Sequence, residues 1–130
     1  MGEIIKVGMA DLKTCKAPDG LITLGLGSCV GIALRDPITQ IGGLAHIMLP
    51  DSKSIITANS VKEKFADTGI EELVRQMVVM GANKNRIVAK IAGGATMFQI
   101  QSRNDIMKIG ERNVQATIAK LNELNICLLA

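Results

Sequence analysis

The chain has 130 residues, enough for one domain that buries a core of its own. Its net charge is only +3, and two Phe with no Trp or Tyr provide few rings on which bases could stack, so these counts disfavour nucleic-acid binding. Three cysteines without a Cys-x-x-Cys pair, together with a single histidine, argue against a disulfide framework or a structural metal site.

The ends and the apolar runs of the chain bear on its location. No signal-peptide pattern opens the sequence, and no apolar run approaches the length of a membrane span. We therefore expect a cytoplasmic protein with no membrane insertion, no cofactor and no metal. In a reducing compartment a lone cysteine is more often structural or catalytic than cross-linked.

The first half of the chain is rich in predicted strands. Residues 3–9 form a short apolar segment, and residues 10–20 are interpreted as a connection that ends in an Asp19-Gly20 turn. Three further apolar runs have the length of strands, at residues 21–23, 29–34 and 42–49. Asp36-Pro37 separates the last two runs, which predicts a β-hairpin.

The second half alternates predicted helices and strands. A helix over residues 62–80 ends at Gly81, and a strand over 86–92 leads into a tight Gly-Gly-Ala turn. A second helix covers 110–122 and a last strand 126–129. The inward faces of the helices are predicted from steps of three and four residues, at Ile70, Leu73, Val74, Met77 and Val78, then at Val114, Ile118 and Leu121. This order indicates one α/β domain over residues 1–130.

Few motifs with known chemistry survive inspection. Gly25-Leu26-Gly27 begins like a dinucleotide-binding fingerprint, but Val30 stands where the third glycine belongs. No phosphate-binding loop, Gly-x-Ser-x-Gly elbow or His-Glu-x-x-His pair occurs. Cys29 and His46 remain, because a thiol becomes a nucleophile when a base such as histidine takes its proton.

The predicted hairpin gives this pair a geometric test. If Gly31 pairs with His46, then Cys29 and His46 are diagonal neighbours on one face, roughly 7–8 Å apart at Cα. A register shifted by one residue would put them on opposite faces. On residue chemistry alone Cys29 is more often a buried small apolar residue, His46 a hydrogen-bonded core histidine and Thr23 an ordinary strand residue.

Three segments together carry a resemblance to a known family. They are Thr23-Leu-Gly-Leu-Gly-Ser-Cys29, Gly42-Gly-Leu-Ala-His46-Ile-Met-Leu-Pro50-Asp51 and Ala92-Gly-Gly-Ala95-x-Met97-Phe98. With them the chain resembles the chemoreceptor glutamine deamidase family, CheD, of bacterial and archaeal chemotaxis. The resemblance runs from Val7 to Ala130.

The resemblance implies a fold, a site and a reaction. The fold is a single-domain, three-layer α/β/α sandwich with a mixed sheet, akin to glutamine-deamidating bacterial toxins. The site is a triad of Cys29, His46 and Thr23. The reaction is hydrolysis of glutamine side-chain amides in the cytoplasmic helices of chemoreceptors, which gives glutamates that can be methylated. The CheY-phosphate phosphatase CheC is the implied partner.

Under this interpretation Cys29 forms a thioester with the glutamine side chain while His46 moves protons and Thr23 orients the imidazole. The backbone N–H groups of Gly27 and Ser28 are the expected oxyanion donors, because a glycine-rich turn lets peptide donors converge. Two alternatives stay open. One is a non-catalytic binding partner or activator of CheC, and the other is a thiol hydrolase or transferase with a different acyl substrate.

Family members continue past the Leu-Leu-Ala position with a further loop and hairpin, whereas this sequence stops at Ala130. The expectation is therefore a single deamidase domain over residues 1–130 that lacks a family C-terminal segment. The three triad positions all precede that segment.

Overall fold

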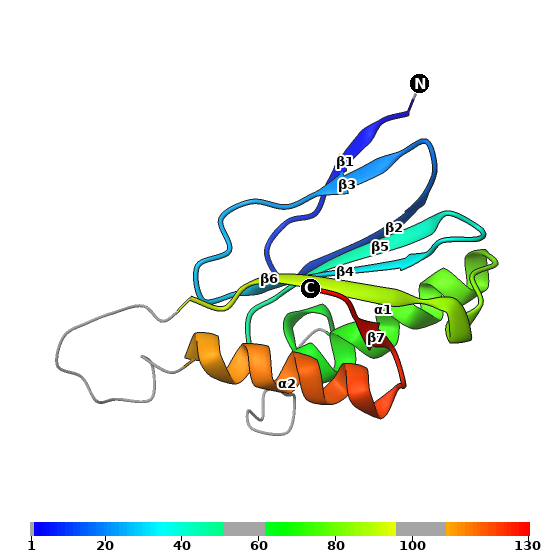
Figure 1. Cartoon of the computed structure of the whole chain (residues 1–130). Coiled ribbons are helices and arrows are strands. Elements are labelled where there is room, and N and C mark those ends of the chain that lie inside the picture. Colours follow the sequence, from blue (N-terminus) through cyan, green and yellow to red (C-terminus); the bar gives the residue numbers. More distant parts are fainter. Residues whose placement is uncertain (1, 51–61, 96–108) are drawn as a thin grey trace, which may run out of the picture.

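A computed structural model describes residues 2–50, 62–95 and 109–130 of the chain (Figure 1). Asp51, Met97 and Phe98, which belong to the motifs quoted above, lie outside these residues. The described elements are, in order, β1 (Ile4–Lys6), β2 (Asp11–Lys16), β3 (Gly20–Ile22), β4 (Val30–Asp36), β5 (Ile41–Ile47), η1 (Lys62–Lys64), α1 (Ala66–Met80), η2 (Lys84–Arg86), β6 (Val88–Gly93), α2 (Ile109–Glu123) and β7 (Cys127–Leu128).

A five-stranded sheet with the order β2-β5-β4-β6-β7 forms the centre of the fold. Its pairs are antiparallel except for the parallel pair β6–β7, so the sheet is mixed. Helices α1 and α2 lie together against one face, and the parallel pair β1–β3 lies on the other side (Figure 1). The predicted α/β class with a mixed sheet is confirmed, and a second helical layer is not among the described residues.

The hydrophobic core lies between the sheet and the two helices. Alternate residues of β4 and β5 point to the helices, which is the pattern of a sheet with one covered face. The buried cluster includes Val30, Ile32, Leu34, Ile41, Ala45, Ile47, Ile70, Leu73, Met77 and Leu121. The intervening residues of both strands, Gly31 and His46 among them, therefore face the side of the sheet that carries no described helix.

The predicted hairpin is confirmed as β4 and β5, and of the two registers that the sequence left open it has the one that pairs Gly31 with His46. Gly31 pairs with His46 and Val30 with Ile47 in an antiparallel ladder. The connection closes with a hydrogen bond of 2.8 Å from the Gln40 N–H to the Asp36 carbonyl. A core face of alternating apolar residues specifies this register, because a slip of one residue would turn them all to solvent.

Helix α1 ends as predicted, but its beginning and one face residue differ. Gly81 takes a left-handed φ of 120° and donates its N–H to the carbonyls of Met77 and Val78, which terminates the helix. The helix begins at Ala66 rather than at residue 62, after a short 3-10 turn. Val78, predicted to face inward, is 44% exposed. Within the described ranges no helix has the length and apolar character that crossing a bilayer needs.

Helix α2 presents the predicted face to the core only in part. Leu121 is buried and Val114 is partly buried against the core, as predicted, whereas Ile118 is 36% exposed and its predicted inward position is wrong. The other buried positions of the helix are mostly polar and were not predicted: Gly110, Asn113, Thr117 and Lys120. Lys120 pairs with Glu71 of α1, which explains how its amine is tolerated at this position. Polar contacts therefore set the rotation of this helix as much as apolar burial does.

Strand β2 contradicts the prediction of a connection over residues 10–20. It pairs with β5 along Asp11–Lys16, and Asp11 lies opposite His46. Only the turn at the end of this stretch is as predicted, where the Asp19 N–H donates to the Lys16 carbonyl. β2 is an edge strand with few apolar side chains, so backbone hydrogen bonds rather than an apolar pattern hold it in the sheet.

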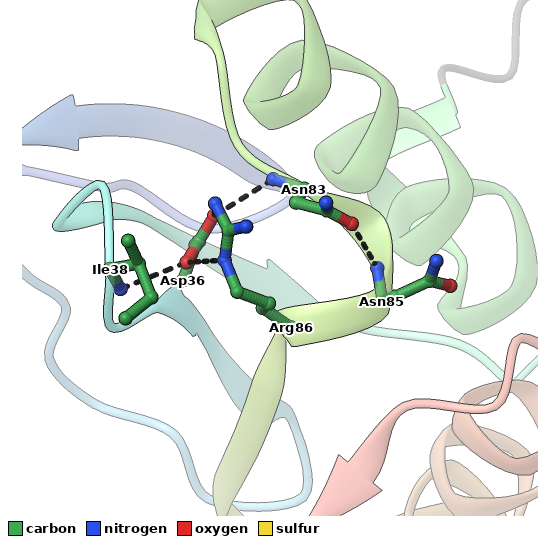
Figure 2. Close-up of polar contacts among 5 residues, drawn as sticks. All are labelled: Asp36, Ile38, Asn83, Asn85 and Arg86. Atoms are coloured by element: carbon green, nitrogen blue, oxygen red, sulfur yellow. Dashed lines mark hydrogen bonds and ion pairs between the residues drawn. The ribbon is translucent and has the colours of Figure 1, made fainter.

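A buried carboxylate secures the end of the hairpin away from His46 (Figure 2). Asp36 is 0% exposed, and its two oxygens accept from the Arg86 guanidinium at 3.0 Å each. The N–H groups of Ile38 and Asn83 donate to the same carboxylate. The Arg86 hydrogen bonds, supported by those N–H groups, hold the pKa of Asp36 well below its usual range.

Asp36→Asn is expected to lower the unfolding midpoint at pH 7 and to flatten its dependence on acid pH. The pKa of Asp36 is lowered on folding, so its contribution is complete above the unfolded value of about 3.9 and is lost as the pH falls below it. Thermal unfolding followed by circular dichroism between pH 7 and pH 2 measures both effects. Glu3→Gln, which changes an exposed carboxylate, is the matched control and should leave the profile unchanged.

Candidate active site

The predicted site residues lie at the end of the sheet where β4 begins and β5 ends. Cys29 immediately precedes β4, two positions before Gly31, and Gly31 is the residue that pairs with His46. Cys29 is 8% exposed and His46 is 1% exposed, so both are buried. The diagonal relation predicted for the thiol and the imidazole is thus the one that the register gives.

Gly31 makes room for the segment that carries Thr23. A Cβ atom at Gly31 would lie 3.4 Å from Leu26 Cδ2 and 3.6 Å from Thr23 Cγ2, so these two side chains pack directly over the glycine. Because Gly31 and His46 are opposite each other in the ladder, Thr23 comes to lie beside the imidazole. A Cβ atom there would make ordinary van der Waals contact, whereas a side chain extending beyond Cβ would meet Leu26 and Thr23.

A hydrogen bond of 2.8 Å joins Thr23 Oγ1 and His46 Nδ1. The same hydroxyl donates to the carbonyl of Val7 at 2.7 Å. A hydroxyl has one proton, so Thr23 must accept from His46 at the other contact. The tautomer assigned by this network therefore carries its proton on Nδ1 and leaves Nε2 as the basic nitrogen.

His46 Nε2 is buried and has no hydrogen-bond partner among the described residues. A buried polar atom is normally paired, so an unpaired basic nitrogen in a folded chain points to a functional role. Burial lowers the pKa of His46 because it disfavours the imidazolium form. The ring is thus neutral at ordinary pH, with a lone pair available to accept a proton.

Burial acts on Cys29 in the complementary direction. It raises the pKa of the thiol because the thiolate is the charged form. Both pKa shifts favour a neutral thiol and a neutral imidazole at rest. The single proton of the thiol then moves to the imidazole when the thiol reacts. Such a pair can act by proton transfer during attack and needs no standing thiolate.

Four consecutive carbonyls at the end of the loop, up to that of Cys29, accept hydrogen bonds. The carbonyls of residues 26 to 29 accept, in order, from the Cys29 N–H, the Ala95 N–H, the Asn113 amide and the Gly94 N–H. Gly27 has a left-handed φ of 50°, which favours glycine at this position. Because C=O and N–H point in opposite directions across a trans peptide, these bonds also fix where the loop N–H groups point.

Several N–H groups of this loop donate to no oxygen of another described residue. Those of Gly27 and Ser28, the expected oxyanion donors, are among them, whereas the Cys29 N–H donates to the Leu26 carbonyl. Gly27 is exposed and Ser28 half-buried. Both N–H groups are therefore available to an acceptor that the described residues do not supply, as an oxyanion donor must be.

Asn113 is a site residue that the sequence reasoning missed. It is 0% exposed on α2, and its amide donates to the carbonyls of Ser28 and Met48. Its spacing of three and four residues from Gly110 and Thr117 was a possible signal of an inward polar stripe. The competing apolar stripe through Ile118 outweighed that signal in the prediction.

A groove of about 310 Å³ borders the site on the face of the sheet without described helices. Thr23, Leu26 and Gly31 line it near the imidazole, and Lys90 and Ala92 of β6 line its far side. Its walls are mainly apolar. Among residues 2–50, 62–95 and 109–130, no three His, Cys, Asp or Glu side chains gather where they could hold a metal ion.

An α/β domain with a cysteine, a histidine and a threonine at one end of its sheet has the composition of a thiol hydrolase site. The family model of CheD chemotactic sensory transduction matches residues 48–130. A probable chemoreceptor glutamine deamidase CheD of Lachnoclostridium phytofermentans is 58% identical over 130 residues, which are 100% of this chain and 80% of the relative.

Two further relatives agree. A probable chemoreceptor glutamine deamidase CheD of Caldanaerobacter subterraneus subsp. tengcongensis is 56% identical over 98% of this chain and 78% of the relative. The chemoreceptor glutamine deamidase CheD of Halalkalibacterium halodurans is 46% identical over 100% of this chain and 80% of the relative. This chain belongs to the CheD family, as the sequence resemblance predicted.

Proposed function

We propose that this protein is a cysteine-dependent hydrolase that converts glutamine side chains of chemoreceptors to glutamate. The names of its relatives support the activity and the substrate. The observation that best supports the chemistry is the hydrogen bond between Thr23 and His46, because it leaves Nε2 as the free base of a buried histidine. We further propose that residues 1–130 form one deamidase domain that acts in the cytoplasm on receptor helices.

In the first half of the reaction, His46 Nε2 takes the proton of Cys29 as the sulfur attacks the side-chain carbonyl carbon of glutamine. The carbonyl oxygen becomes an oxyanion that accepts from the N–H groups of Gly27 and Ser28. When this intermediate collapses, the carbon–nitrogen bond breaks and the imidazolium gives its proton to the leaving nitrogen. Ammonia departs, and a thioester on Cys29 remains.

In the second half, neutral His46 accepts a proton from a water molecule that attacks the thioester. Collapse of the second oxyanion breaks the carbon–sulfur bond and releases glutamate. The imidazolium returns its proton to the sulfur, so the site regains its starting state. One water is consumed and one ammonia is produced in each cycle.

Thr23→Val is expected to lower kcat by about 5-fold, since one neutral hydrogen bond to His46 Nδ1 contributes about 1 kcal/mol. Valine keeps the shape of threonine but leaves the His46 N–H and the Val7 carbonyl without their partner, so the unfolding midpoint should fall as well, and rates are compared where both variants are folded. Thr23→Ser is the matched control, because it restores the hydroxyl and should recover most of the rate. Equal rates for the Val and Ser variants would show that the hydroxyl does not orient the imidazole.

The groove beside the site supports a protein substrate. It is open, lined mainly by small and apolar residues, and bordered by Thr23, the hydrogen-bond partner of His46, so a helix surface could dock beside the site, although neither Cys29 nor His46 lines the groove itself. Lys90 adds one positive charge at its rim, suited to the acidic residues that accompany glutamines on a receptor helix. These features do not select one glutamine over another.

The direct test is incubation with a purified receptor cytoplasmic fragment. We expect release of ammonia together with a mass gain of about 1 Da at individual glutamines, because an amide is replaced by an acid. Cys29→Ala is the control and should give neither signal. A receptor fragment that stays unmodified under wild-type protein, in the absence of ammonia, would exclude the deamidase.

CheC is the proposed regulatory partner, and it also defines the alternative function. If the protein acts only as a non-catalytic binding partner or activator of this phosphatase, Cys29→Ser should stimulate CheC as well as the wild type does while the wild type releases no ammonia. Phosphatase rates at several protein concentrations measure this directly. Under the deamidase proposal, ammonia release is present and disappears in the same variant.

A further inference from the structure

The Cys29 loop and the end of β5 are joined by one buried side chain from α2. Asn113 Nδ2 donates to the Ser28 carbonyl at 2.9 Å and to the Met48 carbonyl at 3.0 Å. Ser28 directly precedes Cys29, and Met48 follows His46 by two residues. The same amide nitrogen therefore bonds both the backbone next to Cys29 and the backbone two residues after His46.

The orientation of this carboxamide is determined by its partners. Both contacts are carbonyl oxygens, so only the NH₂ end can face them, and each amide proton serves one carbonyl. The other end, Oδ1, is buried without a partner among the described residues. An unpaired buried oxygen is destabilising, so packing alone does not favour asparagine at this position.

Helix α2 is held close enough for this contact by two glycines. A Cβ atom at Gly110 would lie 2.2 Å from the Ala95 carbonyl, and one at Gly94 would lie 2.2 Å from Val114 Cγ2. The N–H groups of Gly94 and Ala95 donate to the loop carbonyls of Cys29 and Gly27. The start of α2 and the end of β6 thus form one frame around the loop.

Asn113 differs from the other donors to this loop because it bonds through its side chain. The carbonyls of residues 26, 27 and 29 are bound by backbone N–H groups, and only the Ser28 carbonyl is bound by a side chain. That side chain is also the one that reaches the strand of His46. A change at Asn113 can therefore loosen Cys29 relative to His46 while the backbone bonds remain.

We propose that Asn113 is a positioning residue that holds Cys29 and His46 in reacting geometry by bridging the carbonyls of Ser28 and Met48. This inference rests on the proposed function and extends it to a residue outside the triad. Asn113 touches neither the substrate nor the reacting atoms. It acts by fixing the two backbone segments that carry them.

The test uses Asn113→Asp and Asn113→Ala. Aspartate keeps the shape but puts an acceptor oxygen against both carbonyls in place of Nδ2, and alanine removes both bonds without adding a buried charge. Thr117→Val is the matched control, because Thr117 is equally buried one turn further along α2 and its hydroxyl has no partner among the described residues. Each variant is assayed at a temperature where circular dichroism shows it folded.

Two readouts separate positioning from a structural role. The first is deamidation, in which both Asn113 variants should lose about 100-fold in kcat with KM nearly unchanged, the cost of misplacing a reacting group. The second is the rate of Cys29 alkylation by iodoacetamide at pH 7, followed on the Cys29 peptide because Cys15 and Cys127 are also free thiols. The rate should fall toward that of His46→Ala, since neutral His46 takes the thiol proton during attack only while the two are aligned.

The outcomes are distinct. Folded Asn113 variants with the kcat and the alkylation rate of Thr117→Val would overturn the proposal, as would a loss of stability alone. A wild-type alkylation rate equal to that of His46→Ala would overturn it too, because Asn113 would then have no aligned pair to hold. If the wild type releases no ammonia but the Asn113 variants slow the alkylation of Cys29, the proposed function fails and the positioning role stands.

Discussion

Replacing Cys29 by serine is expected to reduce kcat for receptor deamidation by at least about 10³-fold, the range seen when a covalent nucleophile is removed. A serine hydroxyl has nearly the shape of the thiol but is far less acidic, so neutral His46 cannot activate it to the same extent. Cys29 is 8% exposed and packs at the start of β4, so this small change should leave the unfolding midpoint nearly unchanged.

The control for this loss is another cysteine of the same chain. Cys127 is an exposed thiol at the start of β7, and Cys127→Ser should retain full activity. A Cys29→Ser protein that keeps more than about a tenth of the wild-type rate would show that Cys29 is not a covalent nucleophile. A serine in place of a nucleophilic cysteine is expected to lower the rate by orders of magnitude.

Replacing His46 by glutamine is expected to lower kcat by about 10²- to 10⁴-fold, the usual contribution of a general acid and base. The wild-type pH profile tests the same residue without mutation. The reacting pair carries one proton, so a second proton on His46 stops the reaction and kcat/KM falls on the acid side. Because burial lowers the pKa of His46, the midpoint of that fall should lie below the ordinary value of about 6.5.

Glutamine at position 46 can still donate a hydrogen bond but cannot cycle a proton near neutral pH. Its residual rate should therefore lack the acid limb that the wild type shows. A wild-type profile with no acid limb between pH 4 and pH 8 would mean that His46 is not the base. Rates are compared as kcat/KM because this quantity reports the free protein.

The β4–β5 hairpin was predictable because local signals agreed with the global fold. Asp36-Pro37 marked the turn, and the apolar alternation of the two runs specified the register that pairs Gly31 with His46. The hydrogen bond from His46 Nδ1 to Thr23 Oγ1 was not predictable from spacing, because it depends on β1 and β3 lying across the open face of the sheet. The family resemblance supplied Thr23 instead.

The missed strand β2 and the missed polar positions of α2 have a common physical origin. β2 and the inward face of α2 are held by polar contacts, namely the ladder to β5, the Lys120–Glu71 pair and the Asn113 amide. A reading based on apolar periodicity gives such contacts little weight. The sequence analysis assigned no role to Asn113, because only the folded chain brings it within 3.0 Å of two carbonyls that are 20 residues apart in the sequence.

The thioester on Cys29 is the central claim, and hydroxylamine tests it most directly. Hydroxylamine attacks a thioester in competition with water, so receptor glutamines should gain about 16 Da as hydroxamates in addition to the 1 Da of glutamate. The account predicts that hydroxamate appears at the same glutamines as glutamate, increases with hydroxylamine concentration and is absent with Cys29→Ser. Glutamate formation at an unchanged rate with no hydroxamate at any concentration would contradict it.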